Sequence, residues 1–217
     1  MNKRAAIFDL DGTLIDSLKD IALCCNEVLK ELDIAEHPLP KYSEFVGDGA
    51  YVLIKNALPS SSPEELIQKA LKRFKDIYEN NIYENTKAYG EIDELLKRLK
   101  DENIPVAILS NKPHKFTLKY AEKIFNGYSF VEVFGQREDI PIKPDSQAAL
   151  EISKIMDIEP SDIYFIGDTA TDMRTAKNAG MKAIGVLWGF RDREELESSG
   201  ADYIVSNPKE IADIILR

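Results

Sequence analysis

The chain is poor in the residues that build disulfides and zinc sites. Its 217 residues include two cysteines and two histidines. Cys24 and Cys25 are neighbours in sequence, and adjacent positions on a helix do not face each other, so they support neither a disulfide framework nor a zinc site. With only His37 and His114 available, metal chemistry based on histidine is also poorly supported.

The chain also has no net positive charge and no long apolar run. The formal net charge is −10, which leaves no broad attractive surface for nucleic acid or an anionic membrane, so an anionic substrate must be attracted locally by a few cations or a metal. No apolar run reaches the length of a membrane span, and the first residues lead directly into strand-like sequence without the pattern of a signal peptide. We therefore expect a cytoplasmic protein that binds neither nucleic acid nor membranes.

Short runs of consecutive apolar residues are present and end in turn-forming residues. Continuous apolarity is typical of strands buried on both faces of a parallel sheet. Helical periodicity fills the stretches between them, so the sequence predicts an α/β, Rossmann-like parallel sheet with helices on both faces. The expected strands are 5–10, 105–110, 163–168 and 182–188, with weaker candidates at 130–135 and 202–205. The expected helices are 91–103, 116–126, 146–157 and 171–180, the last with Thr171 as its N-cap and Gly180 past its end.

One region interrupts this alternation. From Asp16 to Asn85 the apolar residues recur at steps of three and four, as in helices, and no strand pattern is evident. This block is longer than a single crossover between strands requires. We predict an inserted α-helical domain over 16–85, within an α/β core made of 1–15 and 86–217. The chain should bend at Gly12 and around residues 14–18 and 83–90, where the insertion leaves and rejoins the core.

Pairs of carboxylates stand at the ends of two predicted strands. Asp9 and Asp11 follow the first strand, and positions two apart in extended backbone share a side. Asp168 ends a later strand, and Asp172 follows it by four residues near a helix start, where an acid can also simply complement the helix dipole. Open α/β sheets bind ligands at the carboxyl ends of their strands. Gathered carboxylates need a shared cation, and hard oxygen ligands favour Mg²⁺.

Two other segments supply groups suited to an anion. In PVAILSNKP, a strand ends with Ser110, Asn111 and Lys112, which offer a hydroxyl and backbone N–H groups suited to a phosphate oxygen, although Ser-Asn is also a common helix cap. Lys143 stands in a short loop between two prolines, where a lysine is often only a solvated charge.

The ordered set DLDGTL, ILSNK, IPIKPD and IGDTATD resembles the four motifs of the haloacid dehalogenase superfamily of phosphatases. The resemblance covers most of the core, and the helical block lies where these enzymes carry a cap domain. It implies the fold of that superfamily, Mg²⁺ as cofactor and a small phosphorylated metabolite as substrate. Dehalogenases and phosphonate-cleaving relatives usually lack an acid at the position of Asp11, so its presence favours phosphate esters.

The resemblance also implies roles for the motif residues. Asp9 would be the nucleophile that forms an aspartyl-phosphate, and Asp11 the general acid and base. Lys143 would offset charge on the phosphoryl group and on the nucleophile. The implied phosphate- or substrate-binding residues are Ser110, Asn111, Gly12, Thr13, Gly47 and Gly49. The implied metal site is formed by Asp9, Asp11 through its backbone carbonyl, Asp168 and, through water or by steadying the lysine, Asp172.

Three segments resemble the phosphoglycolate phosphatase branch: FVGDGAYVLI within the helical block, SNKPHKF, and the tail GVLWGFRDREELESSGADYIV. Lys41, Lys55 and Arg73 are candidates to bind a substrate carboxylate, although each can equally be a solvated helix charge. His114 follows the phosphate-binding motif, where a surface position is the simpler interpretation.

Other functions stay open. The same motifs occur in sugar-phosphate mutases such as β-phosphoglucomutase, and pyrophosphate or nucleotide hydrolysis is a neighbouring possibility. A non-enzymatic receiver-like signalling module would be smaller and without an insertion, and a binding scaffold would not need all four acids. We expect a monomer or a homodimer.

Overall fold

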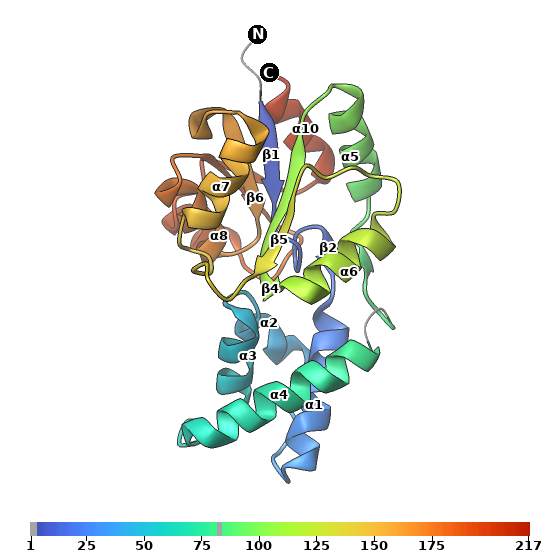
Figure 1. The fold of residues 1–217 in the computed structure, drawn as a ribbon, viewed down its shortest axis with the longest axis vertical. Helices are drawn as coiled ribbons and strands as arrows, with labels where there is room; N and C mark the ends of the chain where they lie inside the picture. Colours follow the sequence, from blue (N-terminus) through green and yellow to red (C-terminus); the bar gives the residue numbers. More distant parts are fainter. Residues whose placement is uncertain (1–3, 82–83) are drawn as a thin grey trace.

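The computed structural model describes residues 4–81 and 84–217. Its centre is a six-stranded sheet in which every neighbouring pair is parallel, in the order β5-β4-β1-β6-β7-β8 (Figure 1). Residue 83, at one edge of a predicted bend, lies outside the described residues. The strands are β1 (Ala5–Phe8), β4 (Val106–Pro113), β5 (Val133–Gln136), β6 (Ile163–Gly167), β7 (Lys182–Val186) and β8 (Tyr203–Val205).

Helices cover both faces of this sheet. Along β1, Ala6 and Phe8 pack into one apolar cluster, while Ala5 and Ile7 pack into another on the opposite face, because successive side chains of a strand alternate in direction. The helices α5 (Ile92–Asp101), α6 (His114–Ile124) and α10 (Pro208–Ile215) contribute to the first cluster. The second cluster is completed by α7 (Gln147–Met156), α8 (Ala170–Asn178) and α9 (Arg193–Ser198). The apolar runs of the strands are therefore explained by burial on both sides.

A layer of helices stands at the carboxyl end of the sheet (Figure 1). It consists of α1 (Leu18–Glu31), α2 (Tyr42–Phe45), α3 (Gly49–Ala57) and α4 (Glu64–Asn81), with a short 3-10 turn at Leu39–Lys41. The name helical layer is used here for residues 18–81. Its position matches the predicted insertion, and its division from the core at residues 15 and 86 stays a prediction.

The chain leaves the core and returns to it side by side. The short strands β2 (Ile15–Asp16) and β3 (Lys87–Ala88) pair antiparallel at this crossing. Beside them, the buried carboxylate of Asp20 accepts hydrogen bonds from the backbone N–H groups and side chains of Asn85 and Thr86. This two-stranded ribbon was not predicted, because strands of two residues are too short to show an alternation of apolar and polar positions.

Contacts also join the helical layer to loops of the core. The guanidinium of Arg191 donates hydrogen bonds to the backbone carbonyls of Ser43 and Val46, the second at 3.0 Å. Thr171 donates its hydroxyl proton to Asp48 at 2.7 Å. These bonds hold the segment between α2 and α3 over the end of the sheet. No helix within the described part of the chain is both long and apolar enough to cross a membrane.

The start of α8 differs from the prediction. Thr169, not Thr171, is its N-cap, and it forms a reciprocal capping box with Asp172. The backbone N–H and hydroxyl of Thr169 both donate to Asp172 Oδ2, at 3.1 and 2.7 Å. The prediction of Thr171 was wrong because the helix begins directly after the strand end, and Thr171 lies in its first turn. Gly180 follows the helix with φ 70°, as expected of a glycine past a helix end.

Candidate active site

Three carboxylates meet where two central strands end. The backbone N–H of Asp9, directly after β1, donates to the carbonyl of Ile166 on β6, so Asp9 and Asp168 end neighbouring strands. Asp172 is carried by the first turn of α8, which follows β6. Oxygen atoms of Asp9, Asp168 and Asp172 all lie within 4.8 Å of one another. The structure therefore brings these three predicted residues together.

Lys143 lies inside this cluster. Its ammonium is 2.9 Å from Asp9 Oδ1 and 2.6 Å from Asp172 Oδ1, and the side chain is only 2% exposed. The loop that carries it is fixed by Asn111, whose side-chain oxygen accepts from the Lys143 backbone N–H at 2.8 Å and whose amide donates to the Lys143 carbonyl at 3.1 Å. Lys143 is therefore a buried ion-pair partner rather than a solvated loop lysine.

Burial sets the electrostatics of the cluster. Loss of solvation raises the pKa of Asp9 to about 7, with Lys143 opposing the shift, and raises the pKa of Asp168 well above its usual value. Burial alone would lower the pKa of Lys143, but the charges of Asp172 and Asp9 together raise it. When all three carboxylates are ionised, they and the one ammonium carry a net charge of −2, which is costly to bury without a further cation. A divalent cation balances that charge, and an all-oxygen donor set suits Mg²⁺.

The side chain of Asp11 points to a different partner. Its two oxygens lie 3.0 and 3.1 Å from the ammonium of Lys112, and Ser17 donates a hydrogen bond to one of them. Asp11 is absent from the three-carboxylate cluster of the described residues. A role for Asp11 at a metal therefore concerns its backbone carbonyl, as the family resemblance implies.

Gly12 and Thr13 contact Asp168. Thr13 donates its hydroxyl proton to Asp168 Oδ1 at 3.0 Å, and the backbone N–H of Phe190 donates to the other oxygen at 2.8 Å. Gly12 has φ +85°, and a Cβ atom there would lie 2.3 Å from Asp168 Oδ2. These contacts orient the Asp168 carboxylate. A direct role of Gly12 and Thr13 at a bound phosphate stays a prediction.

We expect Gly12→Ala to destabilise the protein, because the added methyl group meets a buried carboxylate and the backbone conformation disfavours any side chain. The expected loss is about 1–3 kcal/mol of unfolding free energy or more. Urea denaturation measures it. Gly90→Ala is the matched control, since no heavy atom lies within 4 Å of a Cβ built at Gly90. Equal stability of the two variants would contradict the close packing of Gly12 on Asp168.

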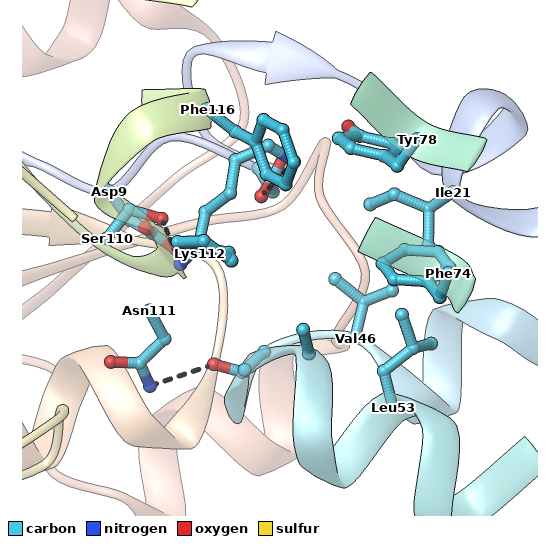
Figure 2. A pocket seen from close by; sticks show the side chains of 15 residues that line it. Asp9, Ile21, Val46, Leu53, Phe74, Tyr78, Ser110, Asn111, Lys112 and Phe116 are labelled. Atoms are coloured by element: carbon cyan, nitrogen blue, oxygen red, sulfur yellow. Dashed lines mark hydrogen bonds and ion pairs between the residues drawn. The ribbon is translucent and has the colours of Figure 1, made fainter. Parts of the chain in front are cut away.

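The cavity beside the cluster lies between the core and the helical layer. Its volume is about 50 Å³. Polar residues of the core form one side, and apolar residues of the helical layer face them (Figure 2). The labelled polar residues are Asp9, Ser110, Asn111 and Lys112. The labelled apolar or aromatic residues facing them are Ile21, Val46, Leu53, Phe74 and Tyr78.

The predicted phosphate-binding residues reach this cavity in different ways. Ser110 is buried at the wall, and its hydroxyl oxygen accepts from the Lys112 backbone N–H at 3.3 Å. The Asn111 amide donates to the carbonyl of Gly47 at 3.1 Å, in addition to its bonds to the lysine loop. Gly47 and Gly49 also line the cavity. Asn111 thus connects the core, the Lys143 loop and the helical layer.

The cationic residues of the helical layer that were candidates to bind a substrate carboxylate do not line the cavity. Lys41 pairs with Glu44 and Arg73 pairs with Glu31, all on exposed side chains, and Lys55 is exposed. None of the three lines the cavity as the structure describes it. His114 follows the same strand end, and its Nδ1 accepts the backbone N–H of Gly135 at 3.1 Å, so this ring has a structural bond.

Lys112 is the functional candidate to whose side chain the sequence assigned no role. Its ammonium lies 4.7 Å from the centre of the Tyr78 ring and 4.9 Å from that of Tyr120, besides its ion pair with Asp11. Its side chain is 5% exposed. The available signal was its place directly after Ser110 and Asn111. Its partners lie on three separate elements, which no local pattern connects.

Comparison with known proteins identifies the family. A family model of haloacid dehalogenase-like hydrolases matches residues 6–186. The phosphoglycolate phosphatase of Aquifex aeolicus is 32% identical, with 98% of this chain and 96% of the relative covered. That of Psychrobacter arcticus is also 32% identical, with coverage of 98% and 93%. A predicted phosphoglycolate phosphatase from Haemophilus somnus, solved by crystallography, superposes with a TM-score of 0.91 at 26% identity, covering 99% of this chain and 98% of that one.

The chain therefore belongs to the haloacid dehalogenase-like hydrolases. The predicted family, its α/β fold with a parallel sheet, and the predicted class of enzyme, a phosphatase of this superfamily, are confirmed. The individual roles predicted for the site residues stay predictions, although the structure brings Asp9, Lys143, Asp168 and Asp172 into one buried cluster.

Proposed function

We propose that this protein is a Mg²⁺-dependent phosphatase of small phosphorylated metabolites, similar to phosphoglycolate phosphatases, and that it acts through an aspartyl-phosphate on Asp9. The observation that carries the proposal is the buried cluster of Asp9, Asp168, Asp172 and Lys143 at the carboxyl end of the sheet. Four ionisable groups are costly to bury together, and such clusters with shifted pKa values gather at functional sites.

In the proposed reaction, a carboxylate oxygen of Asp9 attacks phosphorus in line with the leaving oxygen. The bond from phosphorus to the alcohol oxygen breaks as the bond to Asp9 forms, and Asp11 gives its proton to the departing alcoholate. Asp11 then takes a proton from water, which attacks the phosphorus of the aspartyl-phosphate. Inorganic phosphate leaves and the Asp9 carboxylate is restored.

The other residues hold and neutralise the phosphoryl group. Lys143 reaches Asp9 and Asp172 and offsets the charge that gathers on the phosphoryl oxygens. Ser110 offers a hydroxyl at the cavity wall, and Asn111 positions the lysine loop. Asp9, Asp168 and the backbone carbonyl of Asp11 would hold Mg²⁺, with Asp172 bound through water or steadying Lys143, and the ion would further neutralise the phosphoryl oxygens.

Many converging groups are needed because the uncatalysed reaction is very slow. Enzymes accelerate phosphate-monoester hydrolysis by up to about 10²¹-fold, or roughly 28 kcal/mol at 1.36 kcal/mol per tenfold. A single ion pair does not supply this much. Positioning, a preorganised lysine, a divalent cation and a covalent step act together.

The cavity favours a small substrate. With about 50 Å³ open to the centres of water-sized spheres, it has room for a short carbon skeleton next to the acids and little room for a nucleotide base. Curated relatives at 32% identity act, by their names, on phosphoglycolate. We therefore propose 2-phosphoglycolate or a similarly small phosphate ester. Mutase, pyrophosphatase and nucleotidase activities are the competing outcomes.

The test is a panel of phosphorylated metabolites with the purified protein, with Mg²⁺ and with EDTA. We expect phosphate release to be fastest from 2-phosphoglycolate and to fall at least about 100-fold when EDTA removes the ion. The panel includes pyrophosphate, nucleotides, hexose phosphates and the non-phosphorylated compound chloroacetate. Preferred conversion of β-glucose 1-phosphate to an isomer, or halide release, would overturn the proposed reaction. Activity unchanged in EDTA would overturn the metal dependence.

The predicted cytoplasmic location and the predicted monomer or homodimer are part of the same proposal. All the groups named above come from one chain, so the proposed reaction does not depend on a second subunit.

A further inference from the structure

The proposed substrate has an anionic group besides its phosphate, and the cavity contains one cation outside the acid cluster. Of the described residues that line the cavity, Lys112 alone has a cationic side chain. The facing wall from the helical layer is apolar or aromatic (Figure 2). A carboxylate that leaves water to enter this space requires a charged or hydrogen-bonding partner. The predicted carboxylate-binding cations Lys41, Lys55 and Arg73 do not line it.

Lys112 is held in a defined position beside the reacting groups. Tyr78, from the helical layer, and Tyr120, from the core, place their rings against its ammonium, and their hydroxyls are hydrogen-bonded to each other at 2.7 Å. Aromatic rings attract a cation without neutralising it. The ammonium therefore keeps its charge for an anionic partner, and that partner in the structure is Asp11.

This pairing has a consequence for catalysis. Both carboxylate oxygens of Asp11 lie within 3.1 Å of the Lys112 ammonium, and Ser17 donates a hydrogen bond to one of them. A general acid must place an oxygen next to the leaving-group oxygen of the substrate. While both oxygens of Asp11 contact the Lys112 ammonium, neither is free to contact the leaving-group oxygen alone. The ion pair between Lys112 and Asp11 must therefore separate before Asp11 can transfer a proton.

We propose that Lys112 binds the carboxylate of the substrate and that this exchange of partners releases Asp11 for proton transfer. This inference rests on the proposed function and adds the residue that selects for a carboxylate. A substrate with a carboxylate takes the ammonium from Asp11 and leaves the acid free. A neutral substrate of similar size offers no such exchange, and Asp11 stays engaged. Lys112 is thus both a binding residue and the residue that positions the acid.

The experiment compares 2-phosphoglycolate with ethyl phosphate, which has two carbons and no carboxylate, in the Mg²⁺-loaded enzyme. We expect the wild type to prefer 2-phosphoglycolate. Lys112→Met should lower kcat/KM for 2-phosphoglycolate by about 10- to 100-fold, the range typical of a lost charged hydrogen bond. For ethyl phosphate, kcat should rise in the variant, because Asp11 is no longer paired with an ammonium and this substrate offers Lys112 no carboxylate. The ratio of kcat/KM for 2-phosphoglycolate to kcat/KM for ethyl phosphate should therefore fall well below that of the wild type.

Lys115→Met is the matched control, because Lys115 is an exposed lysine of the same segment, 62% exposed and paired with Glu79. It should keep the wild-type preference. Circular dichroism and melting temperature establish that Lys112→Met is folded, and Lys112→Arg, which keeps the charge, should regain part of the preference.

An equal loss for both substrates in Lys112→Met would overturn the inference and leave the proposed phosphatase function in place, since the lysine would then only position Asp11. A wild type that hydrolyses the two substrates equally, or hydrolyses neither, would overturn both the proposed substrate and the inference.

Discussion

Replacing Asp9 with asparagine is expected to lower phosphate release by about 10⁴-fold or more, the scale of loss seen when a covalent nucleophile is removed. An amide nitrogen or oxygen at this position does not attack phosphorus, while the shape of the side chain is kept. Release of inorganic phosphate from 2-phosphoglycolate at saturating Mg²⁺ measures the loss. Residual activity within about tenfold of the wild type would exclude Asp9 as the nucleophile.

The stability of Asp9→Asn should also depend on pH in a way that a general folding defect would not reproduce. Burial raises the pKa of Asp9 from 3.8 to about 7. The favourable contribution of the neutral carboxyl to folding is therefore complete below pH 3.8 and is lost as the pH rises through 7. Asparagine stays neutral throughout. In EDTA, the melting temperature of Asp9→Asn relative to the wild type should increase between pH 5 and pH 8. A difference in melting temperature that stays constant or falls between pH 5 and pH 8 would contradict this.

Replacing Lys143 with methionine is the substitution from which we expect the largest loss of stability. The ammonium contacts two carboxylates, and its side chain is 2% exposed. Removing one partner of a buried ion pair leaves uncompensated charge, at a cost of about 3–5 kcal/mol. The turnover should also fall by about 10²- to 10³-fold, because charge on the phosphoryl group is no longer offset. Urea denaturation in EDTA and phosphate release with Mg²⁺ measure the two effects.

Two further variants separate this effect from general disruption. Lys154→Met changes an exposed lysine in the helix that follows the same loop, and should be neutral. The double variant Lys143→Met with Asp9→Asn should recover part of the stability of Lys143→Met, because one unpaired charge is removed with its partner. Independent, additive losses would show that Lys143 and Asp9 do not interact, contrary to their distance of 2.9 Å.

The sequence predicted the sheet well because burial on both faces gives strands an uninterrupted apolar pattern. Asp9 and Asp168 were placed together by a rule of topology, since parallel strands end at the same edge. The position of Lys143 was suggested by resemblance, and the structure adds the buried ion pairs that distinguish it from a solvated lysine. Such features are predictable because they depend on local pattern and strand order.

Other features depend on contacts between distant segments. Lys112 contacts Asp11, which lies 101 positions away in sequence, and Tyr78, which belongs to the helical layer. The spacing of residues along the sequence predicts neither contact. Thr171 was predicted as a helix cap on residue type alone, whereas the end of β6 fixed the start of α8 at Thr169. The side chain of Asn111 is used mainly to fix the Lys143 loop and Gly47, a role that only the folded arrangement reveals.

The covalent step is tested most directly by trapping it. The enzyme with Mg²⁺ is mixed with 2-phosphoglycolate carrying radioactive phosphorus, quenched in acid within the first turnover, and mapped by peptide. We predict that the label is attached to the peptide containing Asp9, is released by hydroxylamine as an acyl phosphate should be, and is absent from Asp9→Asn. Label on another residue, or full label in Asp9→Asn, would contradict the proposed mechanism.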